Sequence, residues 1–343
     1  MKTVRQSPPP LPAAGERVQD GLGSRRAERV LVVSLMKSGT HLIQELLVAL
    51  GYGIYGQSRI PPELRPVLDE ETRLRVARLV YADDLPAELE TREEPLFTEA
   101  TDRAWEALGW AWQIRFGLPL ENRYGFEVTN AELIEQAQRR SASSDFADTP
   151  SGLCWVLPEL DVKRLDGRFI REWSRTGEPR IVFNYRDPRD VLLSMVNFLA
   201  GRTRQGFGTF SEFQVFGRIL GSKPSLGEQL TYALTDPSFP GSGDFERALW
   251  LLHHPNVCKV SFEELVGPEG GGSAEAQTRA VARILDFVGA DVDPEGLARR
   301  LYRRDAFSFY RGRIGGWRDV FTTEHLRLFE RRFGDVLSLY GYE

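Results

Sequence analysis

The residues best suited to do chemistry lie in one short stretch, residues 30–44, which read VLVVSLMKSGTHLIQ. The chain has 44 lysines and arginines together, and only five of them are lysines. One of the five, Lys37, follows an apolar run and directly precedes Ser38, Gly39 and Thr40. A compact ammonium on a flexible stem, two hydroxyls and a glycine are typical of a loop that binds a phosphate or a sulfate.

The elements around this stretch place it at the start of a helix. Residues 30–34 predict a continuously apolar strand, of the kind buried in a parallel sheet. Residues 40–50 predict an amphipathic helix that ends before Gly51. The first amides of a helix have no intrahelical acceptor, and the helix dipole makes this end partly positive. The turn is therefore predicted to bind an anion, which Gly39 allows to approach the backbone closely.

Two other interpretations of the loop stay open on these residues alone. The first is a surface lysine beside an ordinary helix start. The second is a Walker A loop, which requires Gly-x-x-x-x-Gly-Lys-Ser/Thr with the lysine after the glycine. Lys37 instead precedes Gly39, and no earlier glycine lies in the loop, so ordinary binding of a nucleoside triphosphate is disfavoured.

A second candidate, Arg186, follows a predicted strand at residues 180–185. Asp187 is a suitable N-cap for a helix that begins directly after it. Arg186 would then stand at the carboxyl end of a strand, where ligands bind in open α/β sheets, and its guanidinium would suit a phosphate. Ser194 lies eight residues after Arg186 on the same helix. The alternative is a surface ion pair between Arg186 and Asp187 or Asp190.

A third segment, FYRGRIGGWRDVFT (309–322), interleaves arginines with glycines. This composition predicts a loop whose backbone and side chains can surround an anion. A solvated basic loop has the same composition. Its arginines are Arg311, Arg313 and Arg318.

Taken together, the three segments resemble the sulfotransferases that use 3′-phosphoadenosine 5′-phosphosulfate (PAPS). VVSLMKSGTHL resembles the family's 5′-phosphosulfate loop, and YRDPRDVLLSMVNF resembles its 3′-phosphate motif. YRGRIGGWRDVFT resembles its C-terminal Arg-Lys-Gly … Gly-Asp-Trp … Phe-Thr segment. HHPNVCKVSFEELVG resembles its strand before a Glu-Asp-Leu helix. The segments occur in the order of the family, so the resemblance covers about residues 30–343.

This resemblance implies a single α/β domain with a P-loop-like, doubly wound sheet of about five parallel strands flanked by helices. It also implies in-line, metal-independent transfer of a sulfuryl group from PAPS to a hydroxyl, which leaves 3′-phosphoadenosine 5′-phosphate (PAP). Lys37 would stabilise the bridging oxygen as the S–O bond breaks. The donor-binding residues carried over by position are Lys37, Ser38, Gly39, Thr40, His41, Arg186, Ser194, Tyr310, Arg311, Gly312 and Arg313.

Several positions depart from the family pattern, and three of them bear on donor binding. His41 and Leu42 replace a common Thr-Trp pair whose tryptophan stacks on adenine, so the adenine contact must come from elsewhere. Tyr310 replaces the first arginine of the C-terminal triplet, and Arg313 is the candidate to compensate for it.

The catalytic base is the largest gap in the resemblance. Many family members carry a histidine before the 3′-phosphate motif, but the corresponding segment here, CWVLPELDVKR (154–164), has none. A base must reach the acceptor proton and be neutral or anionic near pH 7. The candidates are Glu159, Asp161 and His41.

The bulk composition limits the classes of partner. The chain has 343 residues, is 41% hydrophobic and carries a net charge of −5, which predicts a sizeable core and disfavours nucleic-acid or anionic-membrane partners. Two cysteines and four histidines show no metal-ligand spacing. Residues 1–28 are predicted to be a disordered tail without a signal peptide, residues 29–343 one domain, and 200–245 a loop or lid over the acceptor. A cytoplasmic location is expected.

The leading interpretation is a sulfotransferase acting on a small-molecule or carrier-tethered hydroxyl. The excess of arginine over lysine is typical of a GC-rich bacterial genome, where such enzymes often modify secondary metabolites. The alternatives are a non-catalytic PAP- or PAPS-binding relative and a nucleotide kinase on a related fold. Lys37 favours catalysis over binding alone, and the sequence leaves both a monomer and a dimer open.

Overall fold

The computed structural model describes residues 27–55, 68–82, 85–118, 131–201, 211–241, 243–302 and 312–342. Five parallel strands form one sheet in the order β2-β3-β1-β4-β5. The strands are β1 (Arg29–Ser34), β2 (Gly53–Tyr55), β3 (Leu153–Leu157), β4 (Arg180–Tyr185) and β5 (Val257–Ser261). The predicted parallel α/β sheet is confirmed, while the three-residue β2 was not anticipated.

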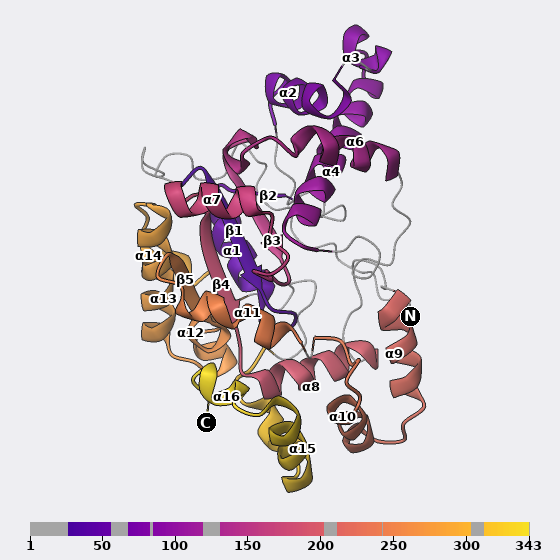
Figure 1. The fold of residues 1–343 in the computed structure, drawn as a ribbon. Coiled ribbons are helices and arrows are strands. Elements are labelled where there is room, and N and C mark those ends of the chain that lie inside the picture. The colour runs from indigo at the N-terminus through magenta and orange to yellow at the C-terminus, as the bar shows by residue number, and fades with distance from the viewer. Residues whose placement is uncertain are drawn as a thin grey trace, which may run out of the picture.

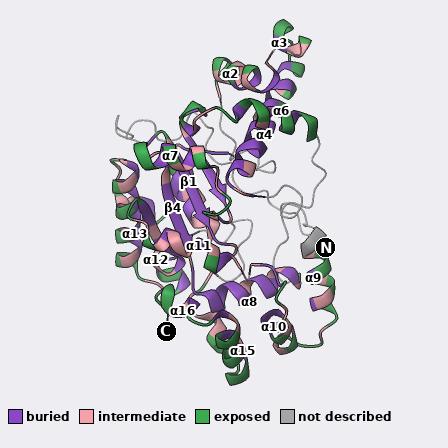
Figure 2. Cartoon of the chain, viewed as in Figure 1, coloured by how far each residue is buried: buried purple, intermediate pink, exposed green. Residues whose placement is uncertain are grey.

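The sheet separates two hydrophobic cores, and helices cover both of its faces (Figure 1). Val30 and Val32 contribute to one core, and Leu31 and Val33 contribute to the other. Because successive side chains of a strand point to opposite faces, a strand buried on both sides must be apolar throughout. This explains the unbroken apolar run of β1. Figure 2 shows the buried residues concentrated on the strands and on the helix α8 (Pro188–Leu199).

The first core is closed by α1 (Thr40–Ala49) and α13 (Ala274–Val288), and the second by α4 (Leu96–Arg115) and α8 (Pro188–Leu199), among others. None of the described helices is both long and apolar enough to cross a membrane. The remaining α-helices are α2 (Glu70–Tyr81), α3 (Ala87–Thr91), α6 (Ala131–Ser141), α7 (Gly167–Thr176), α9 (Ser211–Gly221), α10 (Leu226–Thr235), α11 (Asp244–His253), α12 (Phe262–Leu265), α14 (Pro294–Ala298), α15 (Thr323–Phe333) and α16 (Val336–Leu339).

The expectation of an irregular loop at residues 200–245 is wrong for the described part of that segment, and the expectation of a lid stays a prediction. Residues 211–221 and 226–235 form α9 and α10, and α11 begins at Asp244. The Ser225 side chain caps α10 by accepting a hydrogen bond from the Glu228 amide, and Leu230 is buried in the core. The high glycine and phenylalanine content of this segment favoured a loop in the sequence-based interpretation, so its helix caps and apolar helix faces were overlooked. Residues 202–210 and 242 lie outside the described residues, and the acceptor role of this segment stays a prediction.

The register of the sheet places two of the candidate motifs side by side. β1 pairs with β4 in parallel, and Ser34 at the end of β1 is opposite Asn184 near the end of β4. The loop that follows β1 and the residues that follow β4 therefore leave the same edge of the sheet. This is the edge at which open α/β sheets bind ligands.

Candidate functional site

The loop between β1 and α1 has an unusual backbone that Asn184 holds in place. Lys37 has a left-handed φ of 65° and Gly39 a φ of 85°. The Asn184 side-chain amide donates hydrogen bonds to Ser34 Oγ at 2.9 Å and to the Ser38 carbonyl at 3.0 Å. Thr40 Oγ1 lies 2.7 Å from Ser34 Oγ. A non-glycine residue in the left-handed region persists only where its surroundings fix it, and such residues concentrate at functional sites.

Gly39 is required here for space as well as for its φ. A Cβ on Gly39 would lie 2.6 Å from Cδ2 of the Phe262 ring, inside van der Waals contact. From the sequence, the only role predicted for this glycine is to let a ligand approach the backbone. The structure adds that the loop packs directly on α12.

We expect Gly39→Ala to destabilise the protein by about 1–3 kcal/mol, from left-handed strain and from the clash with Phe262. Gly271→Ala is the matched control, because Gly271 has a φ of 90° and no atom lies within 4 Å of its added Cβ. Chemical denaturation of both variants measures the difference. An equal loss for the two would show that the contact with Phe262 contributes nothing.

Two buried donors of the site lack an acceptor. Ser38 Oγ and Arg186 Nε are buried and have no hydrogen-bond partner among the described residues. Native proteins rarely leave buried polar groups unpaired, and the exceptions call for a specific explanation, such as a ligand. Both atoms are potential hydrogen-bond donors, and with the amides at the start of α1 they make a donor-rich site that suits an anion.

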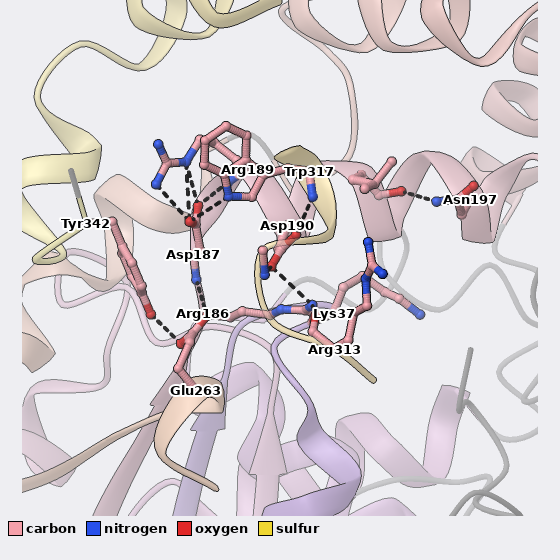
Figure 3. Close-up of polar contacts among 12 residues, drawn as sticks. Lys37, Arg186, Asp187, Arg189, Asp190, Asn197, Glu263, Arg313, Trp317 and Tyr342 are labelled. Atoms are coloured by element: carbon pink, nitrogen blue, oxygen red, sulfur yellow. Dashed lines mark hydrogen bonds and ion pairs between the residues drawn. The ribbon is translucent and has the colours of Figure 1, made fainter. Parts of the chain in front are cut away.

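Arg186 joins the loop to the third segment (Figure 3). Its Nη2 donates to the Arg313 carbonyl at 2.8 Å, and its Nη1 donates to the Lys37 carbonyl at 3.4 Å. The guanidinium stacks on the Phe262 ring, 4.1 Å from its centroid. Arg186 also forms an ion pair with Asp190, in which Nη2 lies 3.4 Å from Oδ2. The Arg186 side chain is not on the surface, because the residue is only 9% exposed. The surface ion pair considered from the sequence is therefore a buried pair within the site.

Asp190 anchors the third segment to the start of α8. Its Oδ2 accepts a hydrogen bond from the Gly315 amide at 2.8 Å, and its Oδ1 accepts one from the Trp317 amide at 2.9 Å. Arg313 forms an ion pair with Asp319 within the segment and is half-exposed. The three motifs, distant in sequence, thus meet around Arg186 and Asp190.

The remaining predicted donor residues divide into three cases. Ser194 is partly buried on α8, the helix that Arg186 precedes. Gly312 is the first described residue of the third segment, and its backbone has a left-handed φ of 54°. Tyr310 and Arg311 lie outside the described residues, so the part of the site predicted for them stays a prediction.

The electrostatics of Lys37 differ from those of a surface lysine. Burial, together with the positive charge of Arg186, lowers the pKa of Lys37 from 10.5 to about 8. Its ammonium lies 4.3 Å from the centroid of the Phe198 ring, a cation–π contact. Lys37 is therefore mostly charged at pH 7 but titrates close to the physiological range.

If Lys37 acts as a cation, kcat/KM should fall as the pH rises above about 8, because this ratio reports the free enzyme. Lys37→Arg should remove the falling limb, since an arginine does not titrate there. A wild-type profile that stays flat through this range would contradict a charged role.

The free energy of unfolding should change with pH in the opposite direction to the activity. Between about pH 8 and 10.5 the folded state binds fewer protons than the unfolded state, because the pKa of Lys37 is lowered on folding. Wild type should therefore gain stability relative to Lys37→Met as the pH rises through that window.

The three candidate bases lie in different environments. Burial and the charge of Lys37 lower the pKa of His41 to about 4, so this imidazole is neutral at pH 7 but weakly basic. Glu159 is buried, and its Oε2 accepts a hydrogen bond from Arg247 Nε at 2.8 Å. Asp161 accepts a hydrogen bond from the Lys163 amide at 2.9 Å. None of these contacts selects one residue as the base.

Two residues of the site were missed from the sequence. Asn184 fixes the loop, and Phe262 contacts both Gly39 and Arg186. An asparagine in the otherwise apolar strand RIVFNY was a signal for the first, because a buried polar residue in a central strand needs partners. No local pattern marked Phe262.

Comparison with known proteins does not assign this chain to a family. Neither a protein-family model nor a curated protein matches the chain. Among solved structures, a mouse sulfotransferase, SULT7A1, complexed with PAP is similar with a TM-score of 0.48 at 14% identity, covering 96% of each chain. Retinol dehydratase in complex with androsterone and the inactive cofactor PAP is similar with a TM-score of 0.41 at 19% identity, covering 91% of this chain and 81% of that one. The assignment of a function therefore depends on the geometry of the site.

Proposed function

We propose that this chain is a PAPS-dependent sulfotransferase that transfers a sulfuryl group to a hydroxyl of a small-molecule or carrier-tethered acceptor. The observation that carries the proposal is the meeting of three separate motifs at Arg186. Its guanidinium contacts the Lys37 loop and the Arg313 segment, and its Nε has no hydrogen-bond partner in the described part of the chain. A donor with anionic groups at two ends of one nucleotide would use all three motifs.

The residues present suit such a donor. Lys37, Ser38 and the first amides of α1 would hold the 5′-phosphosulfate, because they combine a full positive charge with hydrogen-bond donors. Arg186, with Ser194 and Arg313 in support, would hold the 3′-phosphate. PAPS supplies an activated sulfuryl group, and PAP with its bridging oxygen is the leaving group.

In this reaction the protein would position donor and acceptor and stabilise the developing charge, as enzymes do in phosphoryl transfer. The acceptor oxygen forms a bond to sulfur while the bond from sulfur to the bridging oxygen breaks, and the acceptor proton passes to a base. Lys37 would stabilise the negative charge that grows on the bridging oxygen. No metal ion is needed for this sequence of bonds, and the base stays open among Glu159, Asp161 and His41.

A second candidate function is binding of PAP or PAPS without catalysis. One observation favours it: Glu159, a candidate base, is buried in an ion pair with Arg247. A sulfotransfer assay with PAPS and a panel of phenols, alcohols and hydroxylated carriers separates the two candidates. Turnover that depends on Lys37 supports the enzyme, and tight PAP binding without turnover on any acceptor supports the binding protein.

Thermal unfolding with PAP, with ADP and with ATP plus Mg²⁺ tests the donor site itself. A ligand at 100 times its Kd stabilises the folded state by about 2.7 kcal/mol, which is readily measured. We expect PAP alone to raise the midpoint, and to do so without Mg²⁺. A larger shift with ATP and Mg²⁺ would point to a nucleotide kinase and overturn the proposal.

A further inference from the structure

A partly buried carboxylate outside the predicted donor site, that of Glu263, bridges two segments that are distant in sequence (Figure 3). Its Oε1 accepts a hydrogen bond from the Asp187 amide at 3.2 Å, and its Oε2 accepts one from the Tyr342 hydroxyl at 2.6 Å. Burial raises the pKa of Glu263, and the hydrogen bonds from Tyr342 and Asp187 oppose this rise. A partly buried carboxylate depends on its hydrogen-bond donors, because the loss of one leaves a charge that solvent only partly compensates.

The first turn of α12 holds Arg186 at two points. Glu263 binds the amide of Asp187, the residue after Arg186. Phe262, the residue before Glu263, stacks on the Arg186 guanidinium. One short turn therefore fixes both the backbone next to Arg186 and the plane of its side chain.

The segment around Tyr342 also packs on the residue that precedes Arg186. The Tyr185 ring lies 5.7 Å from the Tyr340 ring and 6.4 Å from the Tyr342 ring. Tyr342 itself is held in place, because its amide donates to the Leu337 carbonyl at 2.8 Å. Arg186 is thus flanked on both sides in sequence by residues that contact Tyr342 or its hydrogen-bond partner.

We infer that Tyr342 is a positioning residue for the 3′-phosphate half of the donor site, acting through Glu263 on Asp187 and Arg186. The inference rests on the proposed function, since it assigns the 3′-phosphate to Arg186. Loss of the Tyr342 hydroxyl leaves Oε2 of Glu263, which is partly shielded from solvent, without this donor. Glu263 then shifts toward another donor and releases the Asp187 amide and the Phe262 ring, so Arg186 loses its fixed orientation.

The test compares the affinities of two ligands that differ only in the 3′-phosphate, PAP and AMP, by isothermal titration calorimetry. Tyr342→Phe keeps the ring and removes one hydroxyl, and it should weaken PAP by about threefold to tenfold while AMP binding is unchanged. Tyr340→Phe is the matched control, because it removes the hydroxyl of a nearby tyrosine that donates to the Phe245 carbonyl at 2.7 Å, away from Glu263. Tyr340→Phe should leave the ratio of PAP to AMP affinity at the wild-type value.

The outcomes separate this inference from the proposed function. If wild type prefers PAP over AMP and Tyr342→Phe keeps that preference in full, Tyr342 is structural and the inference fails alone. An equal weakening of PAP and AMP in Tyr342→Phe also overturns it, because a general loss of packing would act on both ligands. If wild type itself shows no preference for PAP, the proposed donor site fails, and the inference fails with it.

Discussion

Replacing Lys37 by alanine is expected to lower kcat by two decades or more while the affinity for PAP changes by much less. The reason is that PAP lacks the sulfuryl group, whereas the charge that Lys37 stabilises grows on the bridging oxygen only as the bond to sulfur breaks. Loss of one well-placed donor to developing charge costs about 2.7–4 kcal/mol in comparable sites. Single-turnover kinetics with saturating PAPS, together with calorimetric PAP titration, measures both quantities.

Two control variants sharpen this experiment. Lys163→Ala removes an exposed lysine outside the site and should leave turnover unchanged. Lys37→Arg keeps a positive charge but replaces a compact ammonium by a planar fork, so turnover should fall between those of wild type and Lys37→Ala. Near wild-type turnover of Lys37→Ala would remove Lys37 from the chemical step.

Arg186→Ala is expected to produce the largest loss of donor binding. Hydrogen bonds to charged groups contribute about 1.5–3 kcal/mol, which corresponds to roughly 10- to 150-fold in Kd for each such contact to the 3′-phosphate. AMP lacks that phosphate, so its affinity should change far less. Titration of wild type and variant with both ligands gives the comparison.

The fold should survive this substitution, because Asp190 keeps its hydrogen bonds from the Gly315 and Trp317 amides. Arg180→Ala is a suitable control, since Arg180 lies at the opposite end of the same strand, β4. It should bind PAP like wild type. If Arg186→Ala loses AMP and PAP to the same extent, the 3′-phosphate does not bind at Arg186.

The parts of the fold that were predictable are those with strong local patterns. An apolar strand, a Ser-Gly-Thr turn and an amphipathic helix gave β1, the Lys37 loop and α1 close to their observed limits. Asp187 and Pro188 marked the start of α8, where Asp187 indeed caps the helix by accepting a hydrogen bond from the Arg189 amide. These elements follow from backbone chemistry that operates within a few residues.

The parts that were missed depend on contacts between distant segments. Phe262 gains its place in the site only because β5 lies next to β4, which brings α12 against Arg186 and Gly39. The bond from Arg186 to the Arg313 carbonyl links residues 127 positions apart, and no periodicity in either segment indicates it. The base was left open for the same reason, since reach toward an acceptor is a property of the assembled site.

The contacts of Arg186 to the Lys37 and Arg313 carbonyls have a consequence for sequence drift. A main-chain carbonyl is present whatever the side chain, so substitutions in either loop leave both acceptors in place. Selection can then change those side chains of the two loops that do not bind the donor, for instance to fit another acceptor molecule, without separating the segments that Arg186 joins. Mutational tolerance should accordingly be higher at position 313 than at position 186, where the contact belongs to the side chain itself.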